Sequence, residues 1–297
     1  MGMPMARNLS RNFPTIVWNR TTSKYAELRD VEATIGQTPS EVARQSSIVF
    51  TMLFDEHAMR SVLSNSFMES LRGKTLVNTS SVSVEFSHYI SKRVQESGGD
   101  YIEMPVSGSK VPAEQGQLVG MMAGDRAISE KIKRFLEPIT REAIYCGPIG
   151  SGLQTKYAIN LYLVSITAGL AESMNLARAQ GLDLEAFGKV LDASPLASPY
   201  SKVKIAKLLR QDWSAQASVR DCYNSTKLIQ SAAETSNAKS PLAKLCLALY
   251  KQANEAGLGN EDMISIIKLL SHAGSEVPGP CDLGSQVHSQ VPDGRLE

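Results

Sequence analysis

The side chains best suited to chemistry are Lys156 and Asn160, which stand four residues apart in a stretch that predicts one long helix over 153–179. Residues at this spacing share one face of a helix, here about a turn after its start. A lysine ammonium can donate a proton to a carbonyl oxygen as hydride arrives at carbon, or its amine can accept one as hydride leaves. A solvated surface lysine is the alternative interpretation.

A second candidate is the loop Pro105-Val106-Ser107-Gly108-Ser109, which follows a predicted strand over 100–106. Hydroxyl residues and glycine at the carboxyl end of a strand let backbone N–H and hydroxyl groups converge on an anion such as a carboxylate. We therefore treat Ser107, Gly108 and Ser109 as candidate substrate-binding residues. An ordinary turn is the alternative.

Two segments near the N-terminus are compatible with a dinucleotide site. Gly2 fits the third glycine of a Gly-x-Gly-x-x-Gly turn, whose strand and first two glycines would lie before Met1, although an ordinary helix start explains it as well. Arg20 follows a predicted strand over 15–19, where an arginine suits a ribose 2′-phosphate. This favours NADP over NAD, with a surface arginine beside a helix cap as the alternative.

The elements that must position these residues fall into two halves. Over 1–149, β-branched runs alternate with helical patterns, which indicates βαβ units and a parallel sheet; the predicted strands are 15–19, 47–53, 75–78, 100–106, 118–123 and 143–146. From 150 to 274 the sequence predicts helices alone, over 153–179, 184–192, 199–209, 218–234, 241–256 and 263–270. Residues 275–297 are typical of a disordered tail. The predicted fold is an α/β Rossmann-type doubly wound sheet followed by an all-α domain.

Composition excludes several classes of protein. The 31 basic and 30 acidic side chains leave a net charge of +1, which provides no broad field for binding nucleic acid or an anionic membrane. No run approaches the roughly 18 apolar residues of a membrane span, and no secretory signal is evident, so we expect a soluble, cytoplasmic protein. The four cysteines and four histidines are too scattered for a disulfide framework or a zinc site, and no protein-bound metal is expected.

Five ordered motifs over about residues 1–270 resemble the β-hydroxyacid dehydrogenases, a family related to 6-phosphogluconate dehydrogenase. It includes 3-hydroxyisobutyrate, tartronate semialdehyde and succinic semialdehyde reductase-type enzymes. The motifs are Gly2-x-Pro4-Met5-Ala6-x-Asn8-Leu9, Asn19-Arg20-Thr21, Pro105-Val106-Ser107-Gly108-Ser109, Gly147-Pro148-x-Gly150-x-Gly152 with Lys156 and Asn160, and Ala256-Gly257-Leu258-Gly259-x-Glu261-Asp262.

The resemblance implies hydride transfer between NADP, or else NAD, and a small hydroxy acid, semialdehyde or related carbonyl compound. It also implies a long interdomain helix and a helical domain used in dimerisation. Lys156 would be the catalytic lysine, Asn160 would orient the substrate, and Ser107, Gly108 and Ser109 would bind its carboxylate. The implied cofactor-binding residues are Gly2, Met3, Asn19, Arg20, Thr21, Leu53, Phe54, Ser80 and Ser81.

The chain departs from the family pattern at three places. The first strand and two glycines of the nucleotide-binding motif are missing, and Ser109 stands where glycine is usual. Asn224-Ser225 replaces the usual Lys-Asp, which makes Asn224 a candidate substrate-binding residue and leaves Arg220, one turn earlier, as a candidate replacement for the lost charge. A second hypothesis is therefore an inactive or scaffolding homologue, or a truncated gene product unable to bind nucleotide.

Overall fold

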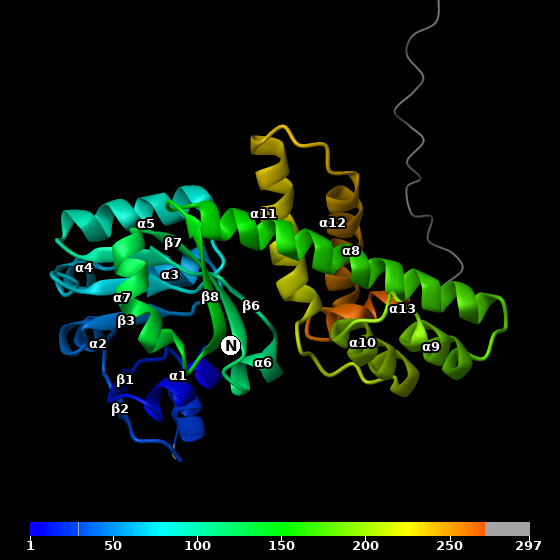
Figure 1. Ribbon diagram of the computed structural model, residues 1–297, viewed down its shortest axis with the longest axis horizontal. Helices are drawn as coiled ribbons and strands as arrows, with labels where there is room; N and C mark the ends of the chain where they lie inside the picture. Colours follow the sequence, from blue (N-terminus) through cyan, green and yellow to red (C-terminus); the bar gives the residue numbers. More distant parts are fainter. Residues whose placement is uncertain (29, 271–297) are drawn as a thin grey trace, which may run out of the picture.

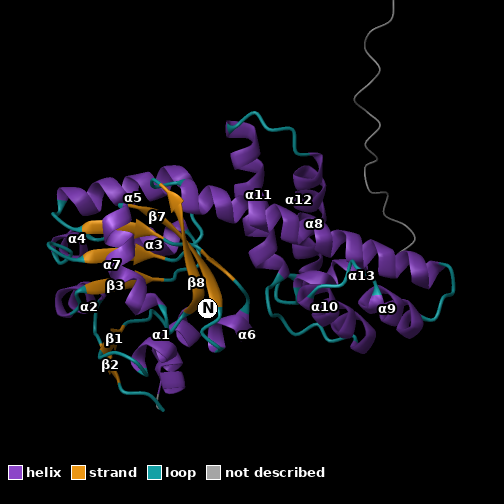
Figure 2. Ribbon diagram, in the orientation of Figure 1, coloured by secondary structure: helices purple, strands orange, loops and turns teal. Residues whose placement is uncertain are grey.

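The computed structural model describes residues 1–28 and 30–270, which form an α/β unit followed by a bundle of helices (Figure 1, Figure 2). This arrangement confirms the predicted fold class. The predicted tail over 275–297 lies outside the described residues. Over the described residues, no helix has both the length and the apolar character needed to cross a membrane.

The main sheet of the α/β unit has the strand order β3-β4-β5-β7-β6, with β8 paired to β7. Its strands are β3 (Ile48–Thr51), β4 (Thr75–Asn78), β5 (Asp100–Glu103), β6 (Val106–Ser107), β7 (Leu118–Gly124) and β8 (Thr140–Gly147). β3, β4 and β5 are parallel, as predicted, but β7 is antiparallel to β5 and to β6. The prediction of a wholly parallel sheet was therefore wrong. Between β5 and β7 the chain forms β6 and the five-residue helix α6 (Lys110–Glu114), too little for a helical crossover to a parallel strand.

A separate two-stranded parallel sheet lies beside the main one. It pairs β1 (Thr15–Val17) with β2 (Ala33–Ile35), and the sequence pattern missed β2, which has only three residues. The chain reaches β1 through α1 (Gly2–Ser10) and leaves it through the 3-10 helix η1 (Thr22–Leu28). Within the described residues β1 and β3 belong to different sheets, so the edges of these two strands are not hydrogen-bonded to each other.

The other helices of the α/β unit are α2 (Pro39–Gln45), α3 (Glu56–Val62), α4 (Asn65–Glu69), α5 (Val84–Glu96) and α7 (Arg126–Leu136). Each begins at a residue whose side chain accepts a hydrogen bond from a first-turn amide; for α5 this residue is Ser83. On α5, Phe86, Ile90 and Val94 repeat at helical spacing and are buried in the core. These helices help to fix the position of the strands. The candidate cofactor-binding residues lie at the carboxyl ends of those strands.

The helical half is built on α8 (Ser151–Ala179), whose 29 residues span about 43 Å at 1.5 Å per residue. Its first turns pack into the α/β core through Leu153 and Tyr157, and its later turns enter a second core through Val164 and Met174. The helices that follow are α9 (Leu184–Ala193), α10 (Pro199–Arg210), α11 (Val219–Thr235) and α12 (Pro241–Ala253), then η2 (Asn254–Leu258), η3 (Met263–Ile266) and α13 (Ile267–Leu270). The helix predicted over 241–256 is α-helical to Ala253 and continues as the π-helical turn η2, which Gly257 interrupts with a φ of 85°.

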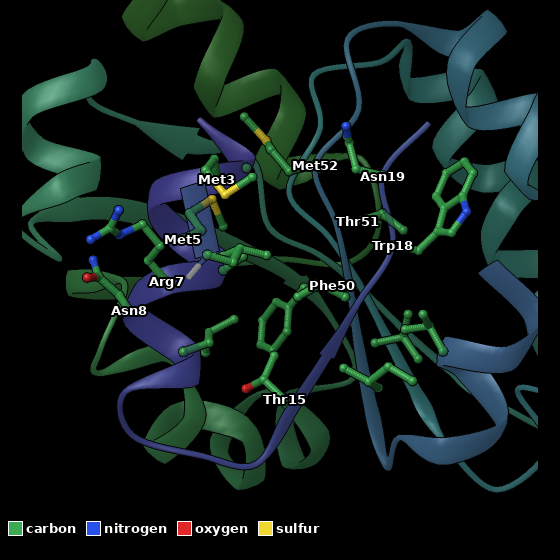
Figure 3. Close-up of a pocket in the computed structure, with 18 of the residues that line it drawn as sticks. Met3, Met5, Arg7, Asn8, Thr15, Trp18, Asn19, Phe50, Thr51 and Met52 are labelled. Carbon is green, nitrogen blue, oxygen red and sulfur yellow. The ribbon is translucent and has the colours of Figure 1, made fainter. Parts of the chain in front are cut away.

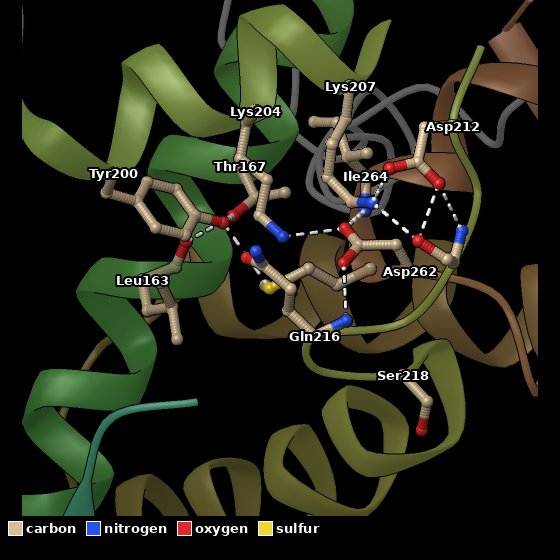
Figure 4. Close-up of polar contacts among 12 residues, drawn as sticks. Leu163, Thr167, Tyr200, Lys204, Lys207, Asp212, Gln216, Ser218, Asp262 and Ile264 are labelled. Atoms are coloured by element: carbon tan, nitrogen blue, oxygen red, sulfur yellow. Dashed lines mark hydrogen bonds and ion pairs between the residues drawn. The ribbon is translucent and has the colours of Figure 1, made fainter. Parts of the chain in front are cut away.

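A buried ion pair fixes the start of α11 (Figure 4). Lys204 Nζ on α10 lies 2.6 Å from Asp262 Oδ1, and the two side chains are 2% and 0% exposed. The other oxygen, Oδ2, accepts from the backbone N–H of Gln216 at 3.0 Å, in the loop that enters α11. Because α11 packs on α8, this pair helps to set the position of α11 beside the turn that carries Lys156.

Candidate active site

The ammonium of Lys156 is half-buried near the start of α8, and no hydrogen-bond or ion-pair partner is found for it over residues 1–28 and 30–270. Burial lowers the pKa of Lys156 from 10.5 to about 8, while the charge interaction with Cys222 acts in the opposite direction. Burial also raises the pKa of Cys222, which stays a neutral thiol. An amine with a pKa near 8 is suited to exchange a proton at physiological pH.

Asn160 lies one turn after Lys156 on the same helix and is 8% exposed. Its Nδ2 donates to Ser225 Oγ on α11 at 2.5 Å, so the amide is oriented by Ser225 and not by its neighbour Asn224. Asn224 is half-buried on the same helix. Arg220 is exposed, and its guanidinium lies beside Gly259, where a Cβ on that glycine would stand 3.5 Å from Nη2. The structure thus gives Arg220 a contact outside the Lys156 region.

The loop 107–109 follows β6 as the pattern predicts. Gly108 has a φ of 135°, and a Cβ there would stand 2.7 Å from Leu118 Cδ2, so only glycine fits this backbone without strain. Ser107 and Ser109 are partly exposed, and neither hydroxyl makes a hydrogen bond to another described residue. Both hydroxyls are free to bind an anion.

The last turn of α1 is tied to the segment that follows this loop. Asn8 is 8% exposed, and its Nδ2 donates to the carbonyl oxygens of Ala113 at 3.0 Å and Glu114 at 3.4 Å. A buried asparagine that joins two short segments holds both at a fixed spacing. Sequence patterns could not reveal this contact, because Asn8 and Ala113 are 105 residues apart.

A pocket of about 1310 Å³ lies among α1, β1, β3 and η1 (Figure 3). It brings together five of the predicted cofactor-binding residues: Gly2, Met3, Asn19, Thr21 and Leu53. Arg20, Phe54, Ser80 and Ser81 do not line it. Part of the pocket is a slot between β1 and β3, lined by residues of both strands from Thr15 to Trp18 and from Ile48 to Met52.

The four predicted residues outside the pocket still follow the strands that border it. Arg20 is exposed after β1, and Phe54 is 58% exposed after β3. Ser80, after β4, is 1% exposed, and its hydroxyl accepts from Leu53 N at 2.8 Å, so it shapes the loop at the end of β3. Ser81 is half-buried beside it. The carboxyl ends of parallel strands are where α/β sheets bind ligands.

The N-terminus of α1 has the character of an anion site. The N–H groups of Gly2 and Met3 have no acceptor within a helix, no side chain caps the helix, and its first turn holds no acidic residue. Arg20, whose guanidinium is exposed, stands between Asn19 and Thr21, which line the pocket. Together with the free N–H groups of α1, this guanidinium fits the phosphate groups of a dinucleotide. Burial lowers the pKa of the Met1 amino group, which lies at the same end of the helix.

An α/β half with a pocket at the start of α1, a long helix whose Lys156 has no partner among the described residues, and a helical half form the arrangement expected of an NAD(P)-dependent dehydrogenase that acts on CH–OH groups. Two family models match in order: the NAD-binding domain of 6-phosphogluconate dehydrogenase over residues 1–147, and the NAD-binding domain of NADP-dependent 3-hydroxyisobutyrate dehydrogenase over 150–270. The chain is also 32% identical over 279 residues to the protein named glyoxylate/succinic semialdehyde reductase 2, chloroplastic, of Arabidopsis thaliana, covering 93% of this chain and 78% of the relative. The chain belongs to the β-hydroxyacid dehydrogenase family.

Other similarities extend the comparison. The cytokine-like nuclear factor N-PAC of Aedes aegypti is 27% identical over 266 residues, which are 88% of this chain and 48% of that protein. The crystal structure of a 3-hydroxyisobutyrate dehydrogenase from Salmonella typhimurium has a TM-score of 0.82 at 22% identity and covers 90% of this chain and 95% of that one. A structure titled Psf3 in complex with NADP+ and 2-OPP has a TM-score of 0.83 at 22% identity and covers 91% and 96%. At these identities the solved structures show a shared fold.

Proposed function

We propose that this chain is an NADP-dependent oxidoreductase that interconverts a small hydroxy acid and its semialdehyde or related carbonyl compound. The observation that carries the proposal is the half-buried ammonium of Lys156, which has no partner among the described residues and whose pKa burial lowers to about 8. The bound nicotinamide supplies or accepts the hydride. Lys156 donates a proton to the carbonyl oxygen in the reductive direction and accepts one from the hydroxyl in the oxidative direction.

Other residues bind and orient the substrate. The hydroxyls of Ser107 and Ser109 and the backbone at Gly108 bind the acidic end, and Asn160, held by Ser225, orients the reacting group. Asn224 stands where the family usually has a lysine, which favours a substrate other than 3-hydroxyisobutyrate. Steady-state turnover on glyoxylate and succinic semialdehyde, compared with uncharged aldehydes of similar size, tests this assignment. Faster turnover of every uncharged aldehyde would contradict the carboxylate-binding role of the loop 107–109.

The preference for NADP over NAD is assigned to Arg20. An exposed guanidinium after β1 suits the 2′-phosphate, while no carboxylate stands at residues 19–23 to bind a free 2′-hydroxyl. Arg20→Ala should raise KM for NADPH by roughly 10- to 100-fold, on the scale of one charge-assisted phosphate contact, and leave KM for NADH unchanged. An equal effect on both cofactors would exclude a 2′-phosphate contact.

Lys156→Ala tests the catalytic assignment. We expect kcat to fall by about 10² to 10⁴, the usual contribution of a general acid or base, while the dissociation constant of NADPH changes little. Lys156→Arg is the matched control, because it keeps the positive charge but cannot release a proton near neutral pH. It should be nearly as inactive as the alanine variant. An undiminished rate in Lys156→Ala would remove the lysine from the mechanism.

The slot between β1 and β3 favours a second candidate: a scaffolding homologue that binds no nucleotide. Two facing strand edges without mutual hydrogen bonds leave backbone groups unpaired next to the nucleotide pocket. N-PAC, a relative whose printed name describes a nuclear factor, is consistent with a non-enzymatic use of this fold. Titration of NADPH by fluorescence separates the candidates: saturable binding supports the enzyme, and its absence supports the scaffold.

We also propose that the protein forms homodimers through its helical half and is cytoplasmic. Large apolar side chains are exposed there on α8, α9 and the loop after it, namely Tyr162 (69%), Val190 (70%) and Leu196 (78%). The mass of the purified chain in solution, measured by light scattering, tests the dimer, and Leu196→Glu should weaken it. Because one relative is named chloroplastic, the location needs imaging of a tagged chain.

A further inference from the structure

A continuous chain of buried hydrogen bonds runs across the sheet from the end of β3 to the start of α8. Thr51 Oγ1 donates to Asn78 Oδ1 at 3.1 Å, and Asn78 Nδ2 donates to the hydroxyl oxygen of Tyr101 at 3.3 Å. The Tyr101 hydroxyl lies 2.9 Å from Ser87 Oγ, which donates to Glu103 Oε2 at 2.5 Å. Since Ser87 has one proton to give and gives it to Glu103, Tyr101 is the donor to Ser87.

Glu103 is the terminal acceptor of this chain and also meets the first turn of α8. Its side chain is 0% exposed. Oε2 accepts from the backbone N–H of Gly150 at 3.1 Å, and Oε1 accepts from that of Leu153 at 2.9 Å. The two carboxyl oxygens thus accept from three donors, and the group lies at the positive end of the α8 dipole. Glu103 therefore serves as the missing cap of a helix whose N-cap residue is glycine.

The same turn of α8 is fixed by two further contacts with the α/β unit. A Cβ at Gly152 would stand 2.5 Å from the carbonyl oxygen of Met121 on β7 and 3.0 Å from Glu103 Oε1, so the helix backbone lies directly against the sheet. Tyr157 donates from its hydroxyl to the carbonyl oxygen of Val82 at 2.5 Å. Lys156 lies between these contacts, three residues after Leu153, and so belongs to the most constrained part of the helix.

From this geometry we infer that Glu103 is a positioning residue for the reaction: it anchors the first turn of α8 to β5 and thereby holds the ammonium of Lys156 at the reacting atoms. The inference rests on the proposed function for its kinetic consequence, whereas the anchoring itself is a property of the fold. A misplacement of a catalytic group by about 1 Å is enough to lower turnover by about 100-fold.

Glu103→Gln tests the inference, because the glutamine amide has nearly the same shape as the carboxyl group but points an N–H donor at one of the three groups that donate to Glu103. We expect kcat to fall by roughly 10- to 100-fold with KM for NADPH nearly unchanged. The backbone amides of Gly150 and Leu153 should exchange with deuterium faster in the full-length variant. Titration of the Lys156 amine by NMR, with a wild-type midpoint near pH 8, should move toward 10.5 as water reaches it.

Ser87→Ala is the matched control, because it breaks the hydrogen-bond chain at Glu103 and leaves both α8 contacts in place. It should lower the melting temperature without changing the Lys156 titration or the exchange at 150 and 153. The positioning role would be overturned if both variants changed the Lys156 titration and the amide exchange equally. It would also be overturned if Lys156 in Glu103→Gln titrated at the same pH as in the wild type. If the wild type shows no turnover, the proposed function fails, but exchange and titration still decide whether Glu103 anchors the lysine.

Discussion

Lys156 carries a charge for which residues 1–28 and 30–270 provide no counterion, and this has a cost in stability. Burial lowers its pKa from 10.5 to about 8, so the folded state disfavours the ammonium relative to the unfolded chain. Lys156→Met should therefore raise the free energy of unfolding at pH 7 by about 1–3 kcal/mol, after allowance for partial solvent screening, even as it abolishes turnover. Urea denaturation of both proteins measures the difference.

The pH dependence of the stability gained in Lys156→Met follows from the number of protons that the folded and unfolded wild type bind. Between about pH 8 and 10.5 the unfolded wild type holds a proton that the folded form has lost, so its stability rises with pH and the advantage of Lys156→Met shrinks. Lys189→Met, at an exposed lysine of α9, should change stability by less than about 0.5 kcal/mol at either pH. A Lys156→Met protein less stable than wild type at pH 7 would show that the ammonium is compensated.

At the residue scale, local spacing was enough to find Lys156 and Asn160, because a helix places residues four apart on one face. The partner of Asn160 could not be predicted, since it depends on how α11 is rotated against α8. Glu103 was missed for a related reason: it reads as an ordinary strand residue until the start of α8, about 50 residues later, is placed beside it. The roles of Lys156, Asn160 and the other site residues remain predictions.

At the scale of elements, the buried pair of Lys204 and Asp262 makes α10, the α11 entry and η3 depend on one carboxylate (Figure 4). Asp262→Asn keeps the side-chain shape and leaves the Lys204 ammonium buried without an anion. We expect a loss of about 3–5 kcal/mol in the free energy of unfolding, the usual cost of breaking a buried pair. Chemical denaturation monitored by circular dichroism measures it.

An exposed pair provides the comparison for this prediction. Lys133 and Glu130 on α7 lie 2.8 Å apart, but their side chains are 46% and 51% exposed. Glu130→Gln should cost less than about 1 kcal/mol, because water solvates both charges already. If Asp262→Asn and Glu130→Gln lose similar stability, water must solvate the Lys204 charge although its side chain is only 2% exposed.

The elements themselves differed in how well the pattern predicted them. The helix predicted over 153–179 matched α8 closely because the segment is rich in Ala, Leu and Met and has Gly169 as its one helix-breaking residue, and β4 matched at both ends. β2 was missed because three residues give no alternation to detect, and the direction of β7 was wrong because strand direction depends on the path of the connection. The path of a connection depends on the tertiary fold, so the local sequence pattern does not reveal it.

At the scale of the whole molecule, the slot between β1 and β3 divides what would otherwise be one sheet. Gly2 lies against Met52, just after β3, so a strand entering α1 through the slot would run parallel to β3. Fusing five β-branched residues and a Gly-x-Gly turn ahead of Met1 should raise the melting temperature by on the order of 5 °C and tighten NADPH binding. Differential scanning calorimetry and fluorescence titration measure the two effects.

The control for this fusion has the same length but alternates proline and aspartate through the strand, which removes ladder donors and buries charge. It should leave both quantities at the values of the unextended chain. Deuterium exchange at Ile16 and Val49 should slow only with the β-branched extension. Equal shifts from both extensions would mean that the slot does not accept a strand.

α8 begins against the sheet and ends some 43 Å away at the rim of the helical bundle, in a single run of hydrogen-bonded turns (Figure 1). A rotation of α8 about its contact with the sheet would move its far end much more than its near end, and Lys156 lies near the end that contacts the sheet. A tilt of about 5° at the sheet would displace the far end by about 4 Å without breaking any turn of an α-helix of that length. A molecule that binds at the rim, such as a second subunit, would thereby be mechanically connected to Lys156.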